Sequence, residues 1–429
     1  MRIRWMARRL AGWGCPRHSL SRPTWFGLAL AALCLVAAPG RAAEKPKVRA
    51  VTAFVRLDRA QYREQIQEAL QMLRKAQASF EESGYEVQSL RISTQPFPEY
   101  IRGLPREQAL AFFHEYDELA RKEGFDAAIG PALRNDADDP GMAELLAEVL
   151  AGTSGLEASL VVAGEDGIHW NGVRAAAKLV KYVADHSLRS QGNFHFAAIA
   201  LVPPETPFYP GSFHLGPRRS FAVALQSANV VGEVFASAPG PASAQQALVR
   251  ALGEHARSIE AVARRVEKES AWEYAGLDLS PAPLKEVSIG AAIEKLTGVK
   301  FGSSGTLTAA ALITGALRQI PVKRAGYSGL MLPVLEDSVL AQRWSEGTLT
   351  LDALLAYSAV CGTGLDVVPL PGDVSAEQLE RIIGDVASLA VKWQKPLSAR
   401  LLPVAGKRAG ERTEFDDPFL VNATIQPLP

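Results

Sequence analysis

Cysteine is scarce in this chain of 429 residues, which contains three, at positions 15, 34 and 361. The first two fall within residues 1–43, which we predict to be a leader outside the fold. Cys361 is then the only cysteine of the folded part, and a disulfide within one chain needs two. A fold held by disulfides is therefore excluded. Stability must come from a hydrophobic core, which a chain of this length with 48% hydrophobic residues can build.

The first 43 residues lack acidic side chains altogether but contain seven arginines. An apolar run from Trp25 to Ala38 and a small-x-small pattern at Gly40-Arg41-Ala42 complete the layout of a secretory signal peptide. We therefore expect residues 1–43 to be a signal peptide and the protein to be periplasmic or secreted. An organellar transit peptide has the same arginine-rich character. A leader left uncleaved would instead anchor the chain to the membrane, although the run is shorter than the roughly 20 residues that span a bilayer.

Neither sign of charge is in excess over the whole chain, which has 46 basic and 46 acidic residues. Without the seven arginines of the leader, 39 basic residues face 46 acidic ones, a net charge of −7. Proteins that bind nucleic acids carry basic surfaces that neutralise phosphates. The composition therefore argues against a nucleic-acid partner and leaves a small-molecule ligand as the expected one.

Apolar strand-like runs alternate with amphipathic helical patterns along the body of the chain. The periodicity predicts strands over 48–57, 85–92, 156–163, 193–202 and 220–225, and helices over 62–80, 105–124, 171–186 and 243–269. This alternation indicates an α/β fold with a mainly parallel sheet, either open or closed into a barrel. No repeat or hydrophilic linker divides residues 44–429, so we expect a single large domain. The apolar stripe of 243–269 suits either the core or the interface of a homo-oligomer.

Two stretches rich in glycine and proline combine polar groups with apolar residues. They are Lys323 to Asp337 (KRAGYSGLMLPVLED) and Tyr357 to Asp373 (YSAVCGTGLDVVPLPGD). Polar groups held close together must be paired with one another or exposed to water. A loop that only connects two elements has no need of such an arrangement, whereas a binding site has. We interpret the stretches as walls of one pocket. A third motif, Gly276 to Pro283, places Asp278 and Ser280 at a strand end, where α/β proteins often build sites.

Small residues precede the apolar helix predicted over 309–317. Gly305 and Thr306 lie where backbone amides at a helix start can face an anion. A plain helix cap accounts for the same residues, and the spacing of a Walker lysine is absent.

Four carboxylates lie at the ends of strand-like runs and, if they converge, would suit magnesium or calcium: Asp278, Glu336, Asp337 and Asp366. Glu336 and Asp337 have a second interpretation, as stabilisers of the start of a helix. Asp373 is excluded, because an extended chain at ~3.3 Å per residue separates it from Asp366 by roughly 20 Å. We expect Asp373 to hold a turn before a helix capped by Ser375, with Gln378 completing a capping box.

The remaining candidates for chemistry are Cys361, Lys323 and Tyr327. Cys361 has the residue type of a nucleophile, with His195 or His214 as the base it would need, but a lone cysteine also fits the core. Lys323 and Tyr327 suit anion binding or acid–base work.

Five motifs together resemble the domain of unknown function family 711, also called uncharacterised protein family 0210. They are Thr206–Pro210 (TPFYP), Gly276–Pro283, Gly305–Thr314 (GTLTAAALIT), Gly326–Asp337 and Tyr357–Asp373. The resemblance extends from about Val48 to the C-terminal strands. It implies a fold similar to the ten-stranded α/β barrel of pyruvate formate-lyase and other glycyl radical enzymes, but no established activity. The leader departs from the usual cytoplasmic member of the family.

The sequence Arg324-Ala325-Gly326-Tyr327 superficially resembles the R-V-x-G-Y element that bears the radical glycine of those enzymes. Gly326 lies 103 residues before the end of the chain, whereas the radical glycine sits near the C-terminus, and the arginine is one residue too close. We therefore expect no glycyl radical, and interpret Gly326 as a site of close backbone approach.

Two classes of function follow from these patterns. In the first, an enzyme acts on a small polar or anionic metabolite in the barrel mouth, with a divalent cation as a candidate cofactor. Its predicted catalytic residues are Asp278, Glu336, Asp366 and Cys361, and its predicted substrate-binding residues are Ser280, Gly305, Thr306, Lys323, Tyr327 and Thr363. In the second, the barrel is a non-catalytic ligand-binding or scaffold module. Carboxyl groups with shifted pKa values would favour the enzyme, and an apolar cavity the binding module.

Overall fold

Five parallel strands form one half of a single sheet. The computed structural model describes residues 44–428, so the predicted leader lies outside the described residues. The parallel strands are adjacent in the sheet and, taken along the chain, are β1 (Lys47–Val55), β2 (Leu90–Thr94), β3 (Asp126–Pro131), β4 (Leu156–Gly164) and β6 (Phe196–Ala200). Helices connect them, as parallel pairing requires.

Four further strands extend this half at both ends and run in the opposite direction. β7 (Ser220–Gln226) pairs antiparallel with β1, and β8 (Glu273–Asp278) pairs parallel with β7. At the other end, β10 (Leu397–Val404) pairs antiparallel with β6, and β9 (Gly364–Pro371) pairs parallel with β10. A short strand, β5 (Gly167–Ile168), pairs only with β4. The result is one mixed sheet of ten strands.

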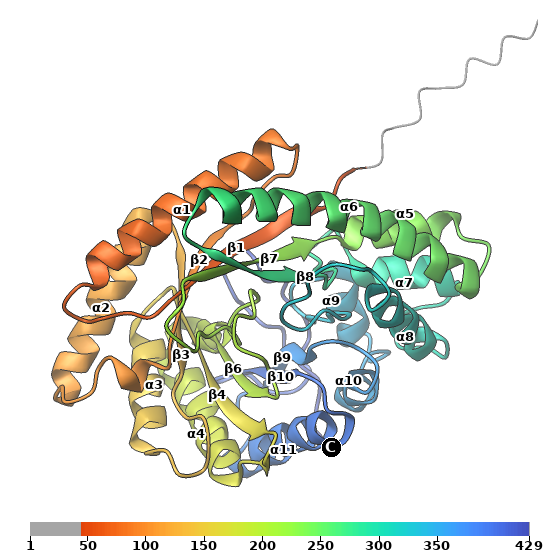
Figure 1. Cartoon of the computed structure of the whole chain (residues 1–429). Coiled ribbons are helices and arrows are strands. Elements are labelled where there is room, and N and C mark those ends of the chain that lie inside the picture. Colours follow the sequence, from red (N-terminus) through yellow and green to blue (C-terminus); the bar gives the residue numbers. More distant parts are fainter. Residues whose placement is uncertain (1–43, 429) are drawn as a thin grey trace, which may run out of the picture. The chain divides into compact units, whose positions relative to one another are not determined.

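The two edge strands of this sheet both touch the segment of residues 323–336. Leu277 at the end of β8 makes a parallel bridge with Arg324, and Asp366 in β9 makes one with Pro333. The sheet therefore curves until its edges meet the same segment, with the helices outside (Figure 1). One of the two stretches singled out in the sequence thus occupies the space between the edges.

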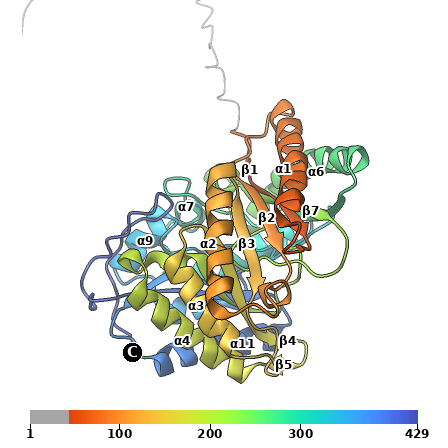
Figure 2. The ribbon, with the colours of Figure 1, turned by 90° about the vertical axis from the view of Figure 1, so that its left-hand side faces the viewer.

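Burial explains the composition of the strands. Every residue of β7, β9 and β10 is buried, and such strands are near-continuously apolar because both faces are covered. The covering helices are α1 (Tyr62–Glu82), α2 (Arg106–Glu123), α3 (Gly141–Gly152), α4 (Trp170–His186), α5 (Ala228–Ser237), α6 (Pro241–Glu269), α7 (Ile289–Thr297), α8 (Thr306–Leu317), α9 (Ser338–Ser345), α10 (Leu351–Ser358) and α11 (Ala376–Trp393). Figure 2 shows α2, α3 and α4 side by side on the outer face. Two 3₁₀ segments, η1 (Phe97–Glu99) and η2 (Leu188–His195), complete the chain.

Several sequence expectations are confirmed here and others need correction. The apolar stripe of α6 is buried within this chain, at Leu248, Leu252 and Ile259 among others, so the core accounts for it without a subunit interface. Ser375 and Gln378 form the expected capping box at the start of α11. The periodicity missed β3, α3 and α5, which are short, and the predicted strand over 85–92 is shifted to Leu90–Thr94. Among residues 44–428, no helix is long and apolar enough to cross a membrane.

Candidate functional site

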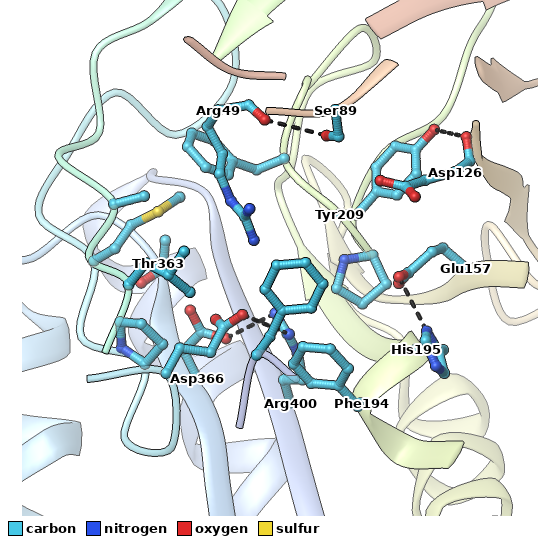
Figure 3. Close-up of a pocket in the computed structure, with 18 of the residues that line it drawn as sticks. Arg49, Ser89, Asp126, Glu157, Phe194, His195, Tyr209, Thr363, Asp366 and Arg400 are labelled. Carbon is cyan, nitrogen blue, oxygen red and sulfur yellow. Dashed lines mark hydrogen bonds and ion pairs between the residues drawn. The ribbon is translucent and has the colours of Figure 1, made fainter. Parts of the chain in front are cut away.

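A cavity of about 390 Å³ lies inside the curve of the sheet (Figure 3). Five of its titratable side chains come from the first residues of the parallel strands, or directly precede them: Arg49 (β1), Arg91 (β2), Asp126 (β3), Glu157 (β4) and His195 (before β6). The amino ends of parallel strands meet at the same edge of a sheet. The fold therefore gathers in one row charges that are far apart in the sequence.

Strand register determines which of these side chains pair. Arg91 lies opposite Asp126, and its Nε is 3.2 Å from Asp126 Oδ2. Ala158 lies opposite Phe196, so the preceding residues, Glu157 and His195, are also neighbours. Glu157 Oε1 is 3.0 Å from His195 Nδ1. Burial lowers the pKa of His195, but the Glu157 carboxylate outweighs it and the pKa is raised above its usual value.

Arg400 forms the opposite wall together with two carboxylates. Its Nη1 donates to Asp366 Oδ1 at 3.4 Å, and its Nη2 is 3.7 Å from Glu336 Oε1. The guanidinium also lies 4.4 Å from the centre of the Phe194 ring. Burial raises the pKa of Asp366 to about 6; Arg400 opposes this rise and Glu336 adds to it. Asp366 is therefore a carboxyl group that can exchange a proton near neutral pH.

Arg49 points into the cavity toward Asp366 and Arg400 (Figure 3). Its Cζ lies 5.0 Å from the centre of the Phe419 ring, and its carbonyl accepts a hydrogen bond from Ser89. Among residues 44–428, its guanidinium has no hydrogen-bond or ion-pair partner. Burial first, and then Arg91, lower its pKa to about 10, so the group stays charged at neutral pH. The cavity thus contains a cation that the described chain does not neutralise by contact.

The segment that follows β6 supports the cavity from within. Thr52 Oγ1 donates to Pro207 O at 3.1 Å, and the Tyr209 hydroxyl donates to Ile92 O at 2.8 Å. These bonds place the Tyr209 ring 4.5 Å from the Arg91 guanidinium. The TPFYP motif therefore has a visible role, which is to position an aromatic ring beside a buried arginine.

Both predicted stretches contribute to the cavity wall. Tyr327 and Glu336 line it from the first, and Thr363 and Asp366 from the second. Burial raises the pKa of Tyr327, which keeps its hydroxyl protonated. Thr363 Oγ1 is buried and has no hydrogen-bond partner within the described chain. Four of the residues named from the sequence therefore lie where a ligand would contact them.

Asp278 and Ser280 do not line this cavity but organise a turn behind it. Asp278 accepts hydrogen bonds from the Ser280 hydroxyl at 2.6 Å and from the amides of Tyr327 and Ser328 at 2.8 and 3.0 Å. Ser280 Oγ accepts from the amide of Gly329 at 3.1 Å. Burial raises the pKa of Asp278 to about 6, against the effect of these bonds. In the structure these two residues shape the segment that carries Tyr327.

The Asp337 side chain links the starts of two helices by hydrogen bonds. It caps α9 through the amides of Val339 and Leu340, and it accepts from the Ser288 hydroxyl at the start of α7 at 2.6 Å. The helix-start interpretation is therefore the correct one for Asp337. The predicted cation site of four carboxylates is not assembled, because Asp278 and Asp337 bind backbone amides elsewhere while Glu336 and Asp366 face Arg400. Among the described residues, no group of three His, Cys, Asp or Glu side chains is arranged to hold a metal ion.

The other predicted site residues also lie outside the cavity lining. Gly305 is the N-cap residue of α8, and Thr306 Oγ1 accepts from the amide of Gly302 at 3.1 Å. The Lys323 ammonium donates to Tyr274 O at 2.5 Å. Cys361 is fully buried in the core, and its carbonyl accepts from the Lys395 ammonium. All four residues therefore make contacts within the fold and lie outside the lining of this cavity.

Sequence patterns could have revealed the arginines and the Glu157–His195 pair. Arg49 and Arg400 each lie within a mainly apolar strand, KVRAVTAFV and LSARLLPV respectively. A charge inside a buried strand is expensive unless it is paired or functional. That rule marks the residues, but only the strand order shows that they meet.

A model of the family described as "Uncharacterised ACR (DUF711)" matches residues 42–416. The chain belongs to this family. The membership inferred from the five motifs is thereby confirmed. Among DUF711 relatives, a UPF0210 protein of Pyrobaculum aerophilum is 36% identical over 346 residues, which cover 76% of each chain. A UPF0210 protein of Desulforudis audaxviator is 32% identical over 351 residues, 78% of each chain. A solved structure, the anaerobic ribonucleotide reductase of Thermotoga maritima with dATP and CTP, matches 88% of this chain and 79% of its own at a TM-score of 0.38 and 8% identity.

Proposed function

We propose that the protein is an enzyme that performs acid–base chemistry on a small polar or anionic metabolite bound in this cavity. The observation that carries the proposal is the placement of two proton-exchanging groups on opposite walls. Asp366 lies on one side and the Glu157–His195 pair on the other, with Arg49 between them (Figure 3). A substrate between these walls would meet an acid and a base at once.

The two walls suit different roles in a proton transfer. Asp366, with a pKa of about 6, can donate or accept a proton near neutral pH. On the other wall, Glu157 holds His195 by one ring nitrogen, which fixes the tautomer and leaves Nε2 for proton exchange. Arg400 would stabilise negative charge as it develops, because it is held rigidly between Asp366, Glu336 and Phe194.

The character of the cavity favours this enzyme over a non-catalytic binding module. Its wall carries three arginines, and it contains carboxylates and a histidine as well. The pKa values of Asp366 and His195 are both raised. Clusters of titratable groups with shifted pKa values in a cleft are typical of active sites.

The same proposal includes the finer description of the fold, a ten-stranded α/β barrel of the pyruvate formate-lyase type. Its support is the pairing of two oppositely directed sets of strands and the segment 323–336 that reaches both edges. The proposed chemistry uses no glycyl radical. Gly326, at φ +61°, packs so closely on the Asp278 carboxylate that a side chain there would collide with it.

We also propose export, on the basis of the leader alone. Residues 1–43 have the layout of a signal peptide. Mass spectrometry of the protein from its native host would then give a mature N-terminus near Ala43, and an intact leader would contradict export.

A screen of small metabolites tests the proposed activity. The wild type is incubated with pooled hydroxy, amino and carboxylic acids, and their consumption is followed by mass spectrometry. We expect Asp366→Asn and His195→Gln each to lower turnover by about 100-fold or more. Asp352→Asn on the exposed side of α10 is the matched control and should behave as wild type. Turnover that survives in both site variants would refute the proposal.

A further inference from the structure

The cavity wall contains an unpaired cation and an unpaired carboxylate oxygen, besides Gln88 Oε1, Thr363 Oγ1 and Arg400 Nε, which also have no hydrogen-bond partner among the described residues. The cation is the guanidinium of Arg49, which stacks on Phe419. The carboxylate oxygen is Glu157 Oε2, a buried acceptor that has no partner among residues 44–428, while Oε1 of the same carboxylate binds His195. Both side chains line the same cavity. Buried polar groups are nearly always satisfied, so Glu157 Oε2 calls for a partner, and a ligand that donates to it can also pair with the half-buried Arg49.

Charge narrows the chemistry of that ligand. Arg91 is occupied by Asp126, and Arg400 by Asp366 and Glu336, which leaves Arg49 as the arginine available to an anion. A guanidinium binds a carboxylate through two parallel hydrogen bonds. Glu336 and Asp366 stand nearby, and their charge would repel a dianion such as phosphate more than a monoanion.

The size of the cavity further restricts the class of ligand. The cavity volume of about 390 Å³ lies near the lower end of the range of about 300–1,000 Å³ that small-molecule sites occupy. The ligand must also bring a hydrogen-bond donor, because Glu157 Oε2 is a buried acceptor without a partner among the described residues. A simple fatty acid would satisfy Arg49 but leave this acceptor unmatched.

We propose that Arg49 is the anion-binding residue of this cavity and that its ligand is a small monocarboxylate carrying a hydroxyl or amino group close to the carboxylate. The carboxylate pairs with the Arg49 guanidinium beneath the Phe419 ring. The hydroxyl or amino group donates to Glu157 or to the carboxylates around Arg400. This inference rests on the proposed function, to which it adds the class of substrate.

Titration calorimetry with defined probes tests the inference on the whole protein. The probes are glycolate and glycine, which carry a donor, acetate, which lacks one, and inorganic phosphate. We expect glycolate or glycine to bind the wild type at least about tenfold more tightly than acetate does. Arg49→Ala should weaken that binding by tenfold or more. Arg49→Lys keeps the charge but loses the paired N–H donors of the guanidinium, and it should weaken binding by less.

The controls separate the loss of the site from the loss of the fold. Arg218→Ala removes an arginine whose side chain is 80% exposed, and it should bind as wild type. Circular dichroism of Arg49→Ala should match the wild type, because the variant removes a half-buried charge without a partner. Equal affinity in Arg49→Ala and wild type, or no binding of glycolate and glycine to the wild type, would overturn the inference. The proposed ligand class would be overturned if acetate or phosphate bound through Arg49 as tightly as glycolate and glycine do.

Failure of the ligand proposal can be distinguished from failure of the proposed acid–base chemistry. Asp366→Asn keeps Arg49 and Glu157, so its probe binding should fall by less than that of Arg49→Ala. If probe binding depends on Arg49 while turnover survives in Asp366→Asn and His195→Gln, the carboxylate site stands and the acid–base proposal fails. If turnover is lost in those variants but the probes bind Arg49→Ala as they bind the wild type, the acid–base proposal stands and the carboxylate site fails.

Discussion

Three arginines of the cavity each lie against an aromatic ring. Arg49 faces Phe419, Arg91 faces Tyr209 and Arg400 faces Phe194. A ring face attracts a guanidinium and holds its plane in one orientation. Burying a cation without a partner is costly, and each ring reduces that cost while it fixes the donors in place. The cavity is therefore rigid at its charged positions before any ligand arrives.

Replacing Asp366 should change how stability depends on pH. Its pKa is raised by burial to about 6, so the folded state holds this proton more tightly than the unfolded chain does. Its contribution to the free energy of unfolding is fully present below about pH 4 and is lost as the pH rises through about 6. Asp366→Asn removes that dependence, so the stability of the variant relative to wild type should rise by roughly 1–3 kcal/mol from pH 4 to 7.

Thermal melts at several pH values measure this difference. Asp352→Asn, on an exposed face of α10, is the control and should follow the wild type at every pH. A constant difference between Asp366→Asn and wild type across the window would mean that Asp366 is not protonated in the fold near pH 5.

The sequence indicated some site residues and missed others for a physical reason. Asp366, Tyr327 and Thr363 belong to glycine-rich and proline-rich motifs, whose composition marks a site locally. Arg49 and Arg400 each lie within a mainly apolar strand, and the side chains that contact them, Phe419 for Arg49 and Asp366 and Glu336 for Arg400, are distant in the sequence. Asp278 misled the prediction, because a carboxylate that binds backbone amides looks the same in sequence as one that binds substrate.

At the scale of elements, single residues join neighbouring helices and loops. Asp337 accepts hydrogen bonds from the starts of both α7 and α9, including the amide of Ile289 at 2.7 Å and that of Leu340 at 3.0 Å. Backbone hydrogen bonds join the same region, from Lys285 N to Glu336 O at 2.7 Å and from Ser338 N to Lys285 O at 3.1 Å. The role of Asp337 at the start of α9 was predictable from the sequence. Its contact with the start of α7 was not, because Ser288 lies 49 residues away.

Asp337→Ala should destabilise both helices together. It leaves several buried donors without an acceptor and removes the N-cap of α9, so we expect a loss of roughly 3–5 kcal/mol. Asp337→Asn keeps one acceptor oxygen and should cost less. Urea denaturation measures the loss, with Asp352→Ala as the exposed control. A loss below about 1 kcal/mol for Asp337→Ala would show that water replaces these bonds.

Two glycines allow the segment 323–336 to cross the start of β9. A Cβ on Gly329 would lie 2.5 Å from Gly362 Cα, and one on Gly362 would lie 2.6 Å from the Gly329 backbone. Backbone cannot move aside as a flexible side chain can. Gly362→Ala should therefore cost roughly 2–4 kcal/mol in unfolding free energy, measured in urea. Gly240→Ala, with extended backbone and no atom within 4 Å of its Cβ position, is the control and should be nearly neutral.

At the scale of the whole molecule, one hydrophobic cluster runs from Val48 to Ile425 and includes residues of all the long strands. The alternation of strands and helices predicted an α/β fold and a mainly parallel sheet. It did not predict that β7 and β10 reverse direction, because pairing between distant strands depends on contacts that no local pattern encodes. The family resemblance supplied what periodicity lacked, since it implied ten strands.

Because this large cluster includes residues of all the long strands, it predicts one cooperative unfolding transition. Tryptophan fluorescence reports on Trp272 and Trp344, both buried, and far-ultraviolet circular dichroism reports on all helices. Because both edges of the sheet depend on the segment 323–336, the two signals should share one urea midpoint, and Gly362→Ala should shift them together. Separate midpoints would indicate that the two groups of strands unfold independently.

The cavity draws its wall from Arg49 at one end of the fold to Phe419 at the other. During synthesis on the ribosome, Arg49 therefore emerges hundreds of residues before the Phe419 ring that lies against it. No nascent fragment that stops short of Phe419 has the complete wall, so a ligand cannot stabilise the chain until almost all of it has been made.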